Sequence, residues 1–154
     1  MERIRLRDYR EGDFDDILNV WQRTGLTNDE RGDNAEIIEC SLQWGGKFFI
    51  LEEKESQRII GTCWITNDSR RLYLHHLGVL PEFQDRGYGK LLLLESIRFG
   101  KQVNLQMKLE VHVTNTNAIH MYEKMGFKHL GDYDVYIIRD MANFSALPGL
   151  LQSK

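Results

Sequence analysis

The chain has 154 residues, of which 42% are hydrophobic and 28% charged, and its formal net charge is −3. These values are typical of one globular domain, and the dispersed basic residues argue against a nucleic-acid surface. No apolar run approaches the roughly 20 residues of a membrane span, residues 1–10 contain no signal-peptide core, and the two cysteines, Cys40 and Cys63, lie far apart. The sequence therefore predicts a cytoplasmic protein with free thiols that binds neither nucleic acid nor membrane.

The first third of the chain predicts one strand followed by two helices. Residues 3–9 alternate charged and apolar side chains, which is typical of a half-buried strand. Apolar residues recur at helical spacing over 14–21 and indicate an amphipathic helix. A second helix, capped by Asp33 or Asn34, is expected to end at the Trp-Gly-Gly of residues 44–46.

Three predicted strands follow in the middle of the chain. They cover residues 47–52, 58–66 and 71–80, and short polar turns at 53–57 and 67–69 join them. Strands connected in this way form an antiparallel meander.

A glycine loop separates the last of these strands from a leucine-rich helix. Residues 77–94 read LGVLPEFQDRGYGKLLLL, and the helix is expected to continue to about Gly100. Backbone N–H groups of such a loop and the adjoining helix N-terminus favour an anion. Gly87 and Gly89 have no third glycine three residues further on, where Leu92 stands, and no Gly-Lys-Ser/Thr follows, so the dinucleotide and P-loop fingerprints fail. The loop either binds another phosphate or is a tight connection without a ligand.

The last third predicts a strand, a short helix and a hairpin. Residues 105–113 alternate and follow a helix, so this strand should lie parallel to the strand before the loop, in a right-handed crossover. Asn115 caps the predicted short helix, and a final hairpin is expected over 127–130 and 133–140. Residues 142–154 show no clear pattern and are expected to form a loose tail.

Two segments of the chain resemble motifs of the GCN5-related N-acetyltransferase (GNAT) family. Residues 77–89 resemble its coenzyme A pyrophosphate motif, and residues 115–127, NTNAIHMYEKMGF, resemble its second cofactor motif. The resemblance spans about residues 4–141 and implies the α/β (α+β) GNAT fold. That fold is a mixed, mostly antiparallel sheet with splayed parallel central strands and about four helices. It also implies a domain over 1–141, followed by the tail 142–154.

The resemblance implies that acetyl-CoA is the co-substrate and that no metal takes part. The pantetheine arm would run along the strand end in the gap between the splayed strands, where Gly78 fits a β-bulge. A backbone N–H of Leu77 or Val79 would hold the thioester oxygen, and the loop would hold the diphosphate. The expected cofactor-binding residues are Leu77, Gly78, Val79, Gln84, Asp85, Arg86, Gly87, Tyr88, Gly89, Lys90 and Asn115.

The resemblance also implies an acid and a base. Tyr122 would protonate the departing thiolate; the alternative, compatible with that role, is a tyrosine that packs the short helix onto the sheet. Glu110 matches the glutamate of the ribosomal-protein N-terminal acetyltransferases in this family and would take the proton of the acceptor amine, directly or through water. A strand covered on both faces would partly desolvate Glu110. The alternatives to Glu110 are His112, His75 and His76, which are otherwise ordinary sheet residues.

The implied reaction is transfer of an acetyl group to a primary amine by direct attack in a ternary complex. The acceptor stays open between a small molecule and a protein or peptide amine. Acidic side chains near the first two helices, at Glu30, Asp33, Glu36 and Glu39, suit a cationic amine or simply form a solvated face. Dimerisation, common in the family, is left open. The alternative function is a non-catalytic acyl-CoA-binding regulatory module of the same fold.

Overall fold

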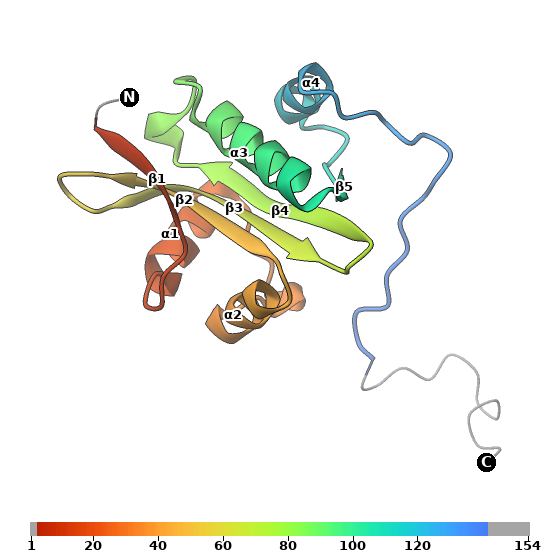
Figure 1. The fold of residues 1–154 in the computed structure, drawn as a ribbon, viewed down its shortest axis with the longest axis horizontal. Coiled ribbons are helices and arrows are strands. Elements are labelled where there is room, and N and C mark those ends of the chain that lie inside the picture. The colour runs from red at the N-terminus through yellow and green to blue at the C-terminus, as the bar shows by residue number, and fades with distance from the viewer. Residues whose placement is uncertain (1–2, 142–154) are drawn as a thin grey trace, which may run out of the picture.

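A computed structural model describes residues 3–141 of the chain. Within them, one sheet contains five strands in the order β1-β2-β3-β4-β5 (Figure 1). The strands are β1 (Ile4–Asp8), β2 (Lys47–Glu53), β3 (Ile59–Asn67), β4 (Arg71–Val79) and β5 (Gln106–Leu109). Strands β1 to β4 pair with one another in antiparallel orientation, and β5 pairs with β4 in parallel orientation. The predicted mixed sheet, its meander and its parallel crossover are confirmed.

Helices cover both faces of this sheet. They are α1 (Phe14–Thr24), α2 (Ala35–Gln43), α3 (Tyr88–Val103) and α4 (Thr116–Lys124), with short 3-10 turns η1 (Asp29–Arg31) and η2 (Pro81–Phe83). In Figure 1, α3 and α4 lie on one side of the sheet and α1 and α2 on the other. Side-chain oxygens of Asn34 and Asn115 accept from the N–H groups of Ile37 and Ala118, so both asparagines cap the helices as predicted.

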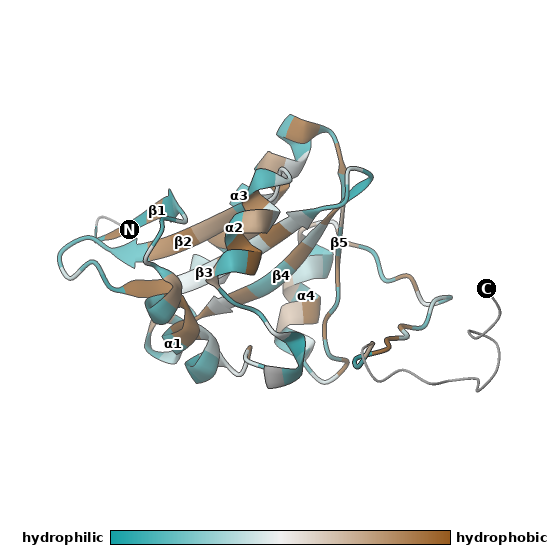
Figure 2. Cartoon of the chain, turned by 90° about the horizontal axis from the view of Figure 1, so that it is seen from below, coloured by the Kyte–Doolittle hydropathy of each residue, from teal (hydrophilic) through white to brown (hydrophobic). Residues whose placement is uncertain are grey.

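The core has two apolar layers, one on each face of the sheet. On the α1 side, the Trp21 ring stacks on Trp64 with centroids 6.4 Å apart and lies beside Phe48. On the α3 side, Cys63 is fully buried and its Sγ lies 3.3 Å from Ser96 Oγ. Figure 2 shows hydrophobic colouring along the strands and helix surfaces of this interior. None of the helices in residues 3–141 is both long and apolar enough to cross a bilayer.

An extra residue in β4 creates a β-bulge in the middle of the sheet. Thr62 pairs with Gly78, but Trp64 pairs with His75, so His76 and Leu77 together face the single residue between them on β3. His76 has a left-handed φ of 47°. The predicted bulge exists, but it lies at His76 and Leu77 and not at Gly78.

Gly78 has a different reason to be glycine. A Cβ there would lie 2.6 Å from Leu26 Cδ1 and 3.2 Å from Thr24 Oγ1. The residues that follow α1 therefore rest directly on the strand end. This close approach places the α1–α2 connection over the end of β4.

β5 is shorter than predicted. It covers Gln106–Leu109, whereas the alternating pattern predicted a strand over 105–113. Its pairing with β4 ends at Leu74 opposite Leu109, because β4 turns away at the bulge and offers no further partner. Residues 110–114 consequently lie beyond the strand.

The predicted final hairpin is wrong. Residues 127–140 form no strand, although a turn does form at the predicted place, where Tyr133 N–H donates to Leu130 O at 3.3 Å. An isolated two-stranded hairpin is marginal in water, and the short β5 offers little edge to pair with. After α4 the chain runs away from the sheet (Figure 1), and Tyr136 is 88% exposed. The predicted tail over 142–154 lies outside the described residues.

A buried carboxylate joins β1 to β2. Glu52 is 2% exposed and accepts hydrogen bonds from Arg5 Nε at 2.7 Å and from Arg7 Nε. Arg7 also forms a two-pronged bond to Asp13, with nitrogen–oxygen distances of 2.7 and 2.9 Å. Burial alone would raise the pKa of Glu52, but its bonds to Arg7 and Arg5 outweigh burial and lower it.

We expect Glu52→Gln to lower the free energy of unfolding by about 2–4 kcal/mol near neutral pH, since Arg7 would lose its buried partner. The pKa of Glu52 is lower in the folded than in the unfolded chain. The charged carboxylate therefore stabilises the fold fully above the unfolded-state pKa, and this stabilisation is lost as pH falls through the folded-state pKa. The deficit of the variant should therefore shrink in acid. Urea unfolding at several pH values measures it, with Glu53→Gln as the matched control. A deficit that is equal at every pH would contradict the role of the charge.

Candidate functional site

The end of β4 leads into the glycine loop through a fixed connection. Leu80 N–H donates to Ile60 O on β3 at 2.8 Å, and Gln84 Nε2 donates to Val79 O at 2.8 Å. Gln84 was predicted to offer its amide to the cofactor. In the structure, one N–H of that amide instead holds the loop against the strand end.

The loop forms a concave run of backbone donors. Asp85 and Gly87 have φ values of 59° and 81°, and Gly87 precedes the first residue of α3. Among the described residues, the N–H groups of 85–90 donate to no carbonyl or side chain. Donors arranged in this way at a helix N-terminus, where the helix dipole is positive, form a site for a phosphate group.

Of the two cationic side chains near these donors, one already has partners within the protein. Arg86 Nη2 donates to Glu82 O at 2.9 Å, and its guanidinium lies 5.5 Å from the centre of the Phe83 ring. Lys90 is exposed and forms no ion pair within the described chain. Lys90 is therefore the cation of this loop that remains available to an anion.

Glu82 connects the loop to the rest of the molecule. Its carboxylate accepts two bonds from Arg23, at 2.9 and 3.0 Å, and one from Arg58 at 2.7 Å. The bond from Arg23 and that from Arg58 lower the pKa of Glu82 to about 2. The turn before the loop is thus attached to the end of α1 and to the start of β3.

The sheet opens beside the loop. β4 and β5 pair only as far as Leu74 and Leu109, so residues 75–79 have no strand on the side away from β3. Successive N–H groups of a strand point to opposite sides. Because Leu80 N–H points to β3, the N–H of Val79 points into the opening. Of the two predicted oxyanion donors, Val79 is therefore well oriented.

Tyr122 lies on α4 and packs against the hydrophobic core. Its ring packs edge-on against Phe127, with centroids 5.8 Å apart, and is half-buried. Burial raises the pKa of Tyr122 to about 12, so the phenol keeps its proton near neutral pH. A Cβ on Gly89 would lie 3.8 Å from Met121 Sδ and 4.0 Å from Leu77 Cδ2. The two predicted motifs therefore meet at one place.

Glu110 is not buried as predicted. It follows β5, its side chain is 47% exposed, and Lys108 Nζ lies 3.7 Å from its Oε1. It was expected on a strand covered on both faces, but the strand ends one residue earlier. His112 is also exposed, and its Nδ1 is hydrogen-bonded to Thr114 Oγ1 at 2.8 Å.

The bulge brings both neighbouring histidines to the α1 side of the sheet. Regular alternation would place His75 and His76 on opposite faces, yet their rings lie 5.6 and 5.7 Å from the Trp64 ring. His75 Nε2 lies 2.9 Å from Thr66 Oγ1. Burial lowers the pKa of each histidine to about 4, so both are neutral near neutral pH. A sequence pattern alone does not reveal this arrangement.

His76 has an unusual environment. Its side chain is 5% exposed, and its ring stacks on Trp21 with centroids 4.1 Å apart. Nε2 lies 3.1 Å from Asp33 Oδ2, but the direction is poor, and neither ring nitrogen has a hydrogen-bond partner among the described residues. Burial raises the pKa of Asp33.

The acidic residues predicted to attract a cationic amine are mostly engaged. Glu30 pairs with Arg139 at 3.1 Å, and Glu39 accepts from the Tyr9 hydroxyl at 3.0 Å. Asp33 faces His76, and Glu36 is exposed on α2. The surface near η1 and α2 is therefore not a concentrated negative patch.

Comparison with known proteins assigns the chain to a family. The sequence profile described as the Acetyltransferase (GNAT) family matches residues 14–127. The chain belongs to the GNAT acetyltransferase family. It is 28% identical over 130 residues to an acetyltransferase of Photorhabdus laumondii, and the aligned region covers 81% of this chain and 87% of that protein.

Solved structures share the GNAT fold. An acetyltransferase from Streptococcus agalactiae superposes with a TM-score of 0.75 at 17% identity, over 91% of this chain and 94% of the other. A GNAT family acetyltransferase from Elizabethkingia anophelis, solved with acetyl-CoA bound, superposes with a TM-score of 0.59 at 18% identity, over 83% and 78%. The predicted GNAT fold is confirmed.

The two loop glycines make a matched pair for testing the anion site. We expect Gly87→Ala to lower the free energy of unfolding by about 1–2 kcal/mol, because its φ is left-handed. Gly89 has ordinary backbone and room for a methyl group, so Gly89→Ala should change stability by less than about 1 kcal/mol. That methyl group should still weaken coenzyme A binding by ~10-fold, since the diphosphate approaches the backbone. Calorimetric titration and urea unfolding separate the effects, and unchanged affinity in Gly89→Ala would contradict this site.

Proposed function

We propose that this chain transfers the acetyl group of acetyl-CoA to a primary amine, which attacks the thioester directly in a ternary complex. The observation that carries the proposal is the run of unengaged backbone N–H groups over residues 85–90 beside the opening of the sheet. A diphosphate fits these donors. Membership of the acetyltransferase family supports the same donor substrate.

The cofactor would occupy the loop and the strand end together. Its diphosphate would accept from residues 85–90, with Lys90 adding a charge. Its pantetheine amides would pair with backbone groups of residues 77–79, as an added strand does. Asn115 would act through its cap of α4, since its side-chain oxygen already accepts from Ala118 N–H.

The chemistry would then use groups around the opening. The acceptor nitrogen forms a bond to the thioester carbon, and the carbonyl oxygen becomes an oxyanion held by Val79 or Leu77 N–H. The carbon–sulfur bond breaks, and Tyr122 gives its proton to the thiolate. Glu110, which is in contact with solvent, takes the proton from the amine directly or through water.

The basic test combines binding with turnover. Acetyl-CoA should raise the melting temperature, and thiol release should be followed across small amines, polyamines, amino acids and peptide amines. Thiol release that depends on an amine supports the transferase. Stabilisation without thiol release from any amine would contradict it and favour the non-catalytic acyl-CoA-binding module.

We expect Tyr122→Phe to lower kcat by ~100-fold with little change in the Kd of acetyl-CoA. The phenyl ring preserves the packing against Phe127 but has no proton to give. Steady-state kinetics and calorimetric titration measure the two quantities, with Tyr136→Phe, on the exposed C-terminal segment, as the control. Turnover equal to that of the parent would leave Tyr122 only a packing role.

We expect Glu110→Gln to lower kcat/KM by ~10-fold or more near neutral pH, and the deficit to shrink as pH rises. An amine with a pKa of about 10 is mostly protonated at neutral pH, so a variant without a base must wait for the free amine in solution. Each increase of one pH unit raises that fraction about tenfold until the amine titrates. A pH series against Glu123→Gln, an exposed glutamate on α4, measures it. A deficit independent of pH would argue for a positioning role.

A further inference from the structure

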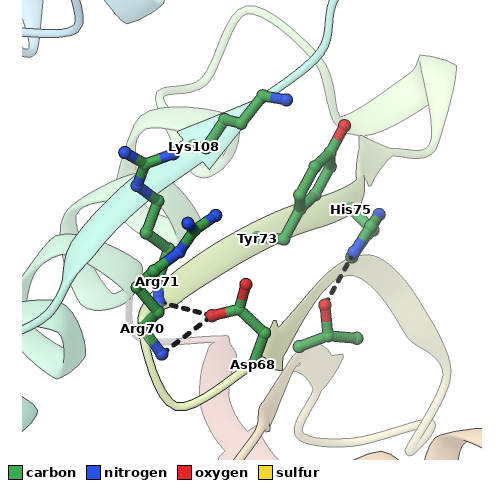
Figure 3. A pocket seen from close by; sticks show the side chains of 7 residues that line it. Asp68, Arg70, Arg71, Tyr73, His75 and Lys108 are labelled. Atoms are coloured by element: carbon green, nitrogen blue, oxygen red, sulfur yellow. Dashed lines mark hydrogen bonds between the residues drawn. The ribbon is translucent and has the colours of Figure 1, made fainter. Parts of the chain in front are cut away.

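A hollow of about 340 Å³ lies on the α1 side of the sheet, over β4 and β5 (Figure 3). Its floor is made by the rings of Tyr73 and His75, which stack with centroids 4.3 Å apart. Its wall carries Arg70 from the β3–β4 turn, Arg71 from the start of β4 and Lys108 from β5. In the close-up, both arginine side chains lie across the hollow from His75. Nothing in the proposed transfer mechanism uses this hollow.

The charge of the hollow is mainly positive. Arg70 and Arg71 form no side-chain ion pair within the described residues. Asp68 also lines the hollow, but its Oδ1 accepts from the backbone N–H groups of Arg70 and Arg71, at 2.9 and 2.5 Å. Two arginines without an ion-pair partner among the described residues, and Lys108, which pairs with Glu110, thus face one carboxylate that the turn already uses. Guanidinium groups that lack a partner bind carboxylate or phosphate oxygens in pairs.

The hollow lies beside Glu110, the proposed base, to which Lys108 links it. Tyr73 pairs with Lys108, so their side chains stand together, and Lys108 Nζ lies 5.3 Å above the Tyr73 ring. Glu110, the proposed base, is two residues beyond Lys108 and reaches it at 3.7 Å. Along β4, Tyr73 and Leu77 are four residues apart, and the bulge takes up about one of these steps, so their separation corresponds to about 10 Å of strand. A molecule in the hollow would therefore extend one end to the thioester.

We propose that the acceptor is a primary amine carrying a carboxylate or phosphate group about 10 Å from its nitrogen, and that the hollow binds this anion. This distance is the one from Tyr73, on the floor of the hollow, to the strand end at Leu77. The Tyr73 and His75 rings pack against the chain that links the two groups, while Arg70 and Arg71 hold the anion. The identity of the acceptor class rests on the proposed transferase function, but the anion site rests on the hollow itself.

The test compares amines that differ only in the terminal group. Unbranched ω-amino carboxylates of five to nine carbon atoms are measured beside the amino alcohols and aminoalkyl phosphates of the same lengths. At the best length we expect kcat/KM to be ~10-fold higher for the anionic member of the pair than for the alcohol. The carboxylate and phosphate arms decide which anion the hollow prefers.

The arginines are tested with a double variant. Arg70→Gln/Arg71→Gln should remove the preference for the anionic acceptor, while kcat/KM for the amino alcohol stays at the parent value. Arg98→Gln on α3, on the opposite face of the sheet, is the matched control and should keep the preference. An equal preference in the double variant and the parent would overturn the site.

Binding measured without turnover separates this proposal from the transferase. Calorimetric titration of the same compounds, with coenzyme A present, should show the carboxylate or phosphate bound ~10-fold more tightly than the alcohol, and only in proteins that keep Arg70 and Arg71. If thiol is released equally with every amine, the anion site is overturned and the transferase stands. If no amine releases thiol but anionic compounds still bind through the arginines, the anion site stands and the transferase fails.

Discussion

A short buried chain of hydrogen bonds shapes the middle of the molecule. Trp21 Nε1 donates to Thr62 Oγ1 at 3.0 Å, and that hydroxyl donates to the carbonyl of His76 at 3.0 Å. His76 is the residue with left-handed backbone in the β-bulge, so one helix and one neighbouring strand together hold the extra residue in place. Without the bulge, β4 would continue alongside β5. The opening, the orientation of Val79 and the direction of both histidines all depend on it.

The proposed donor side and the proposed acceptor side of the site are built differently. The donor side consists mostly of backbone groups fixed by the loop, whose geometry the sequence of glycines permits. The acceptor side consists of side chains on the opposite face of the same strands, and its charges come from a turn and a strand edge.

Local sequence patterns predicted most of the fold. Helical periodicity, asparagine caps and the strand–loop–helix order around Gly87 were sufficient for the helices, the meander and the parallel crossover. The bulge was predicted at Gly78, one or two residues after its position at His76 and Leu77. Gly78 is required because a side chain there would collide with Leu26, and not because of its backbone angle. The length of β5 could not be read from its alternation, since it depends on where β4 stops pairing. The final hairpin failed for a related reason, as strands need an edge as well as a pattern.

The candidate site was only partly predicted, because local patterns do not show which distant elements come together. Residues adjacent in sequence, such as those of the loop, were brought together as expected, whereas their binding role stays a prediction. The burial of Glu110 was wrong because it depended on a strand that ends before it. The contact between Asp33 and His76 and the cluster of Arg70, Arg71 and Lys108 join separate elements, and no spacing rule in the sequence relates them.

The ion pairs of Glu82 make the glycine loop at residues 84–90 sensitive to ionic strength. Glu82, Arg23 and Arg58 are each about 40% exposed, so dissolved ions screen their attraction, which buried pairs largely escape. The tether of the loop to α1 therefore weakens as ionic strength rises. Salt would also compete with the proposed diphosphate for the loop itself. Two separate electrostatic contributions to donor binding would then decline together, while the hydrogen bonds that hold the bulge lie in the interior and do not weaken.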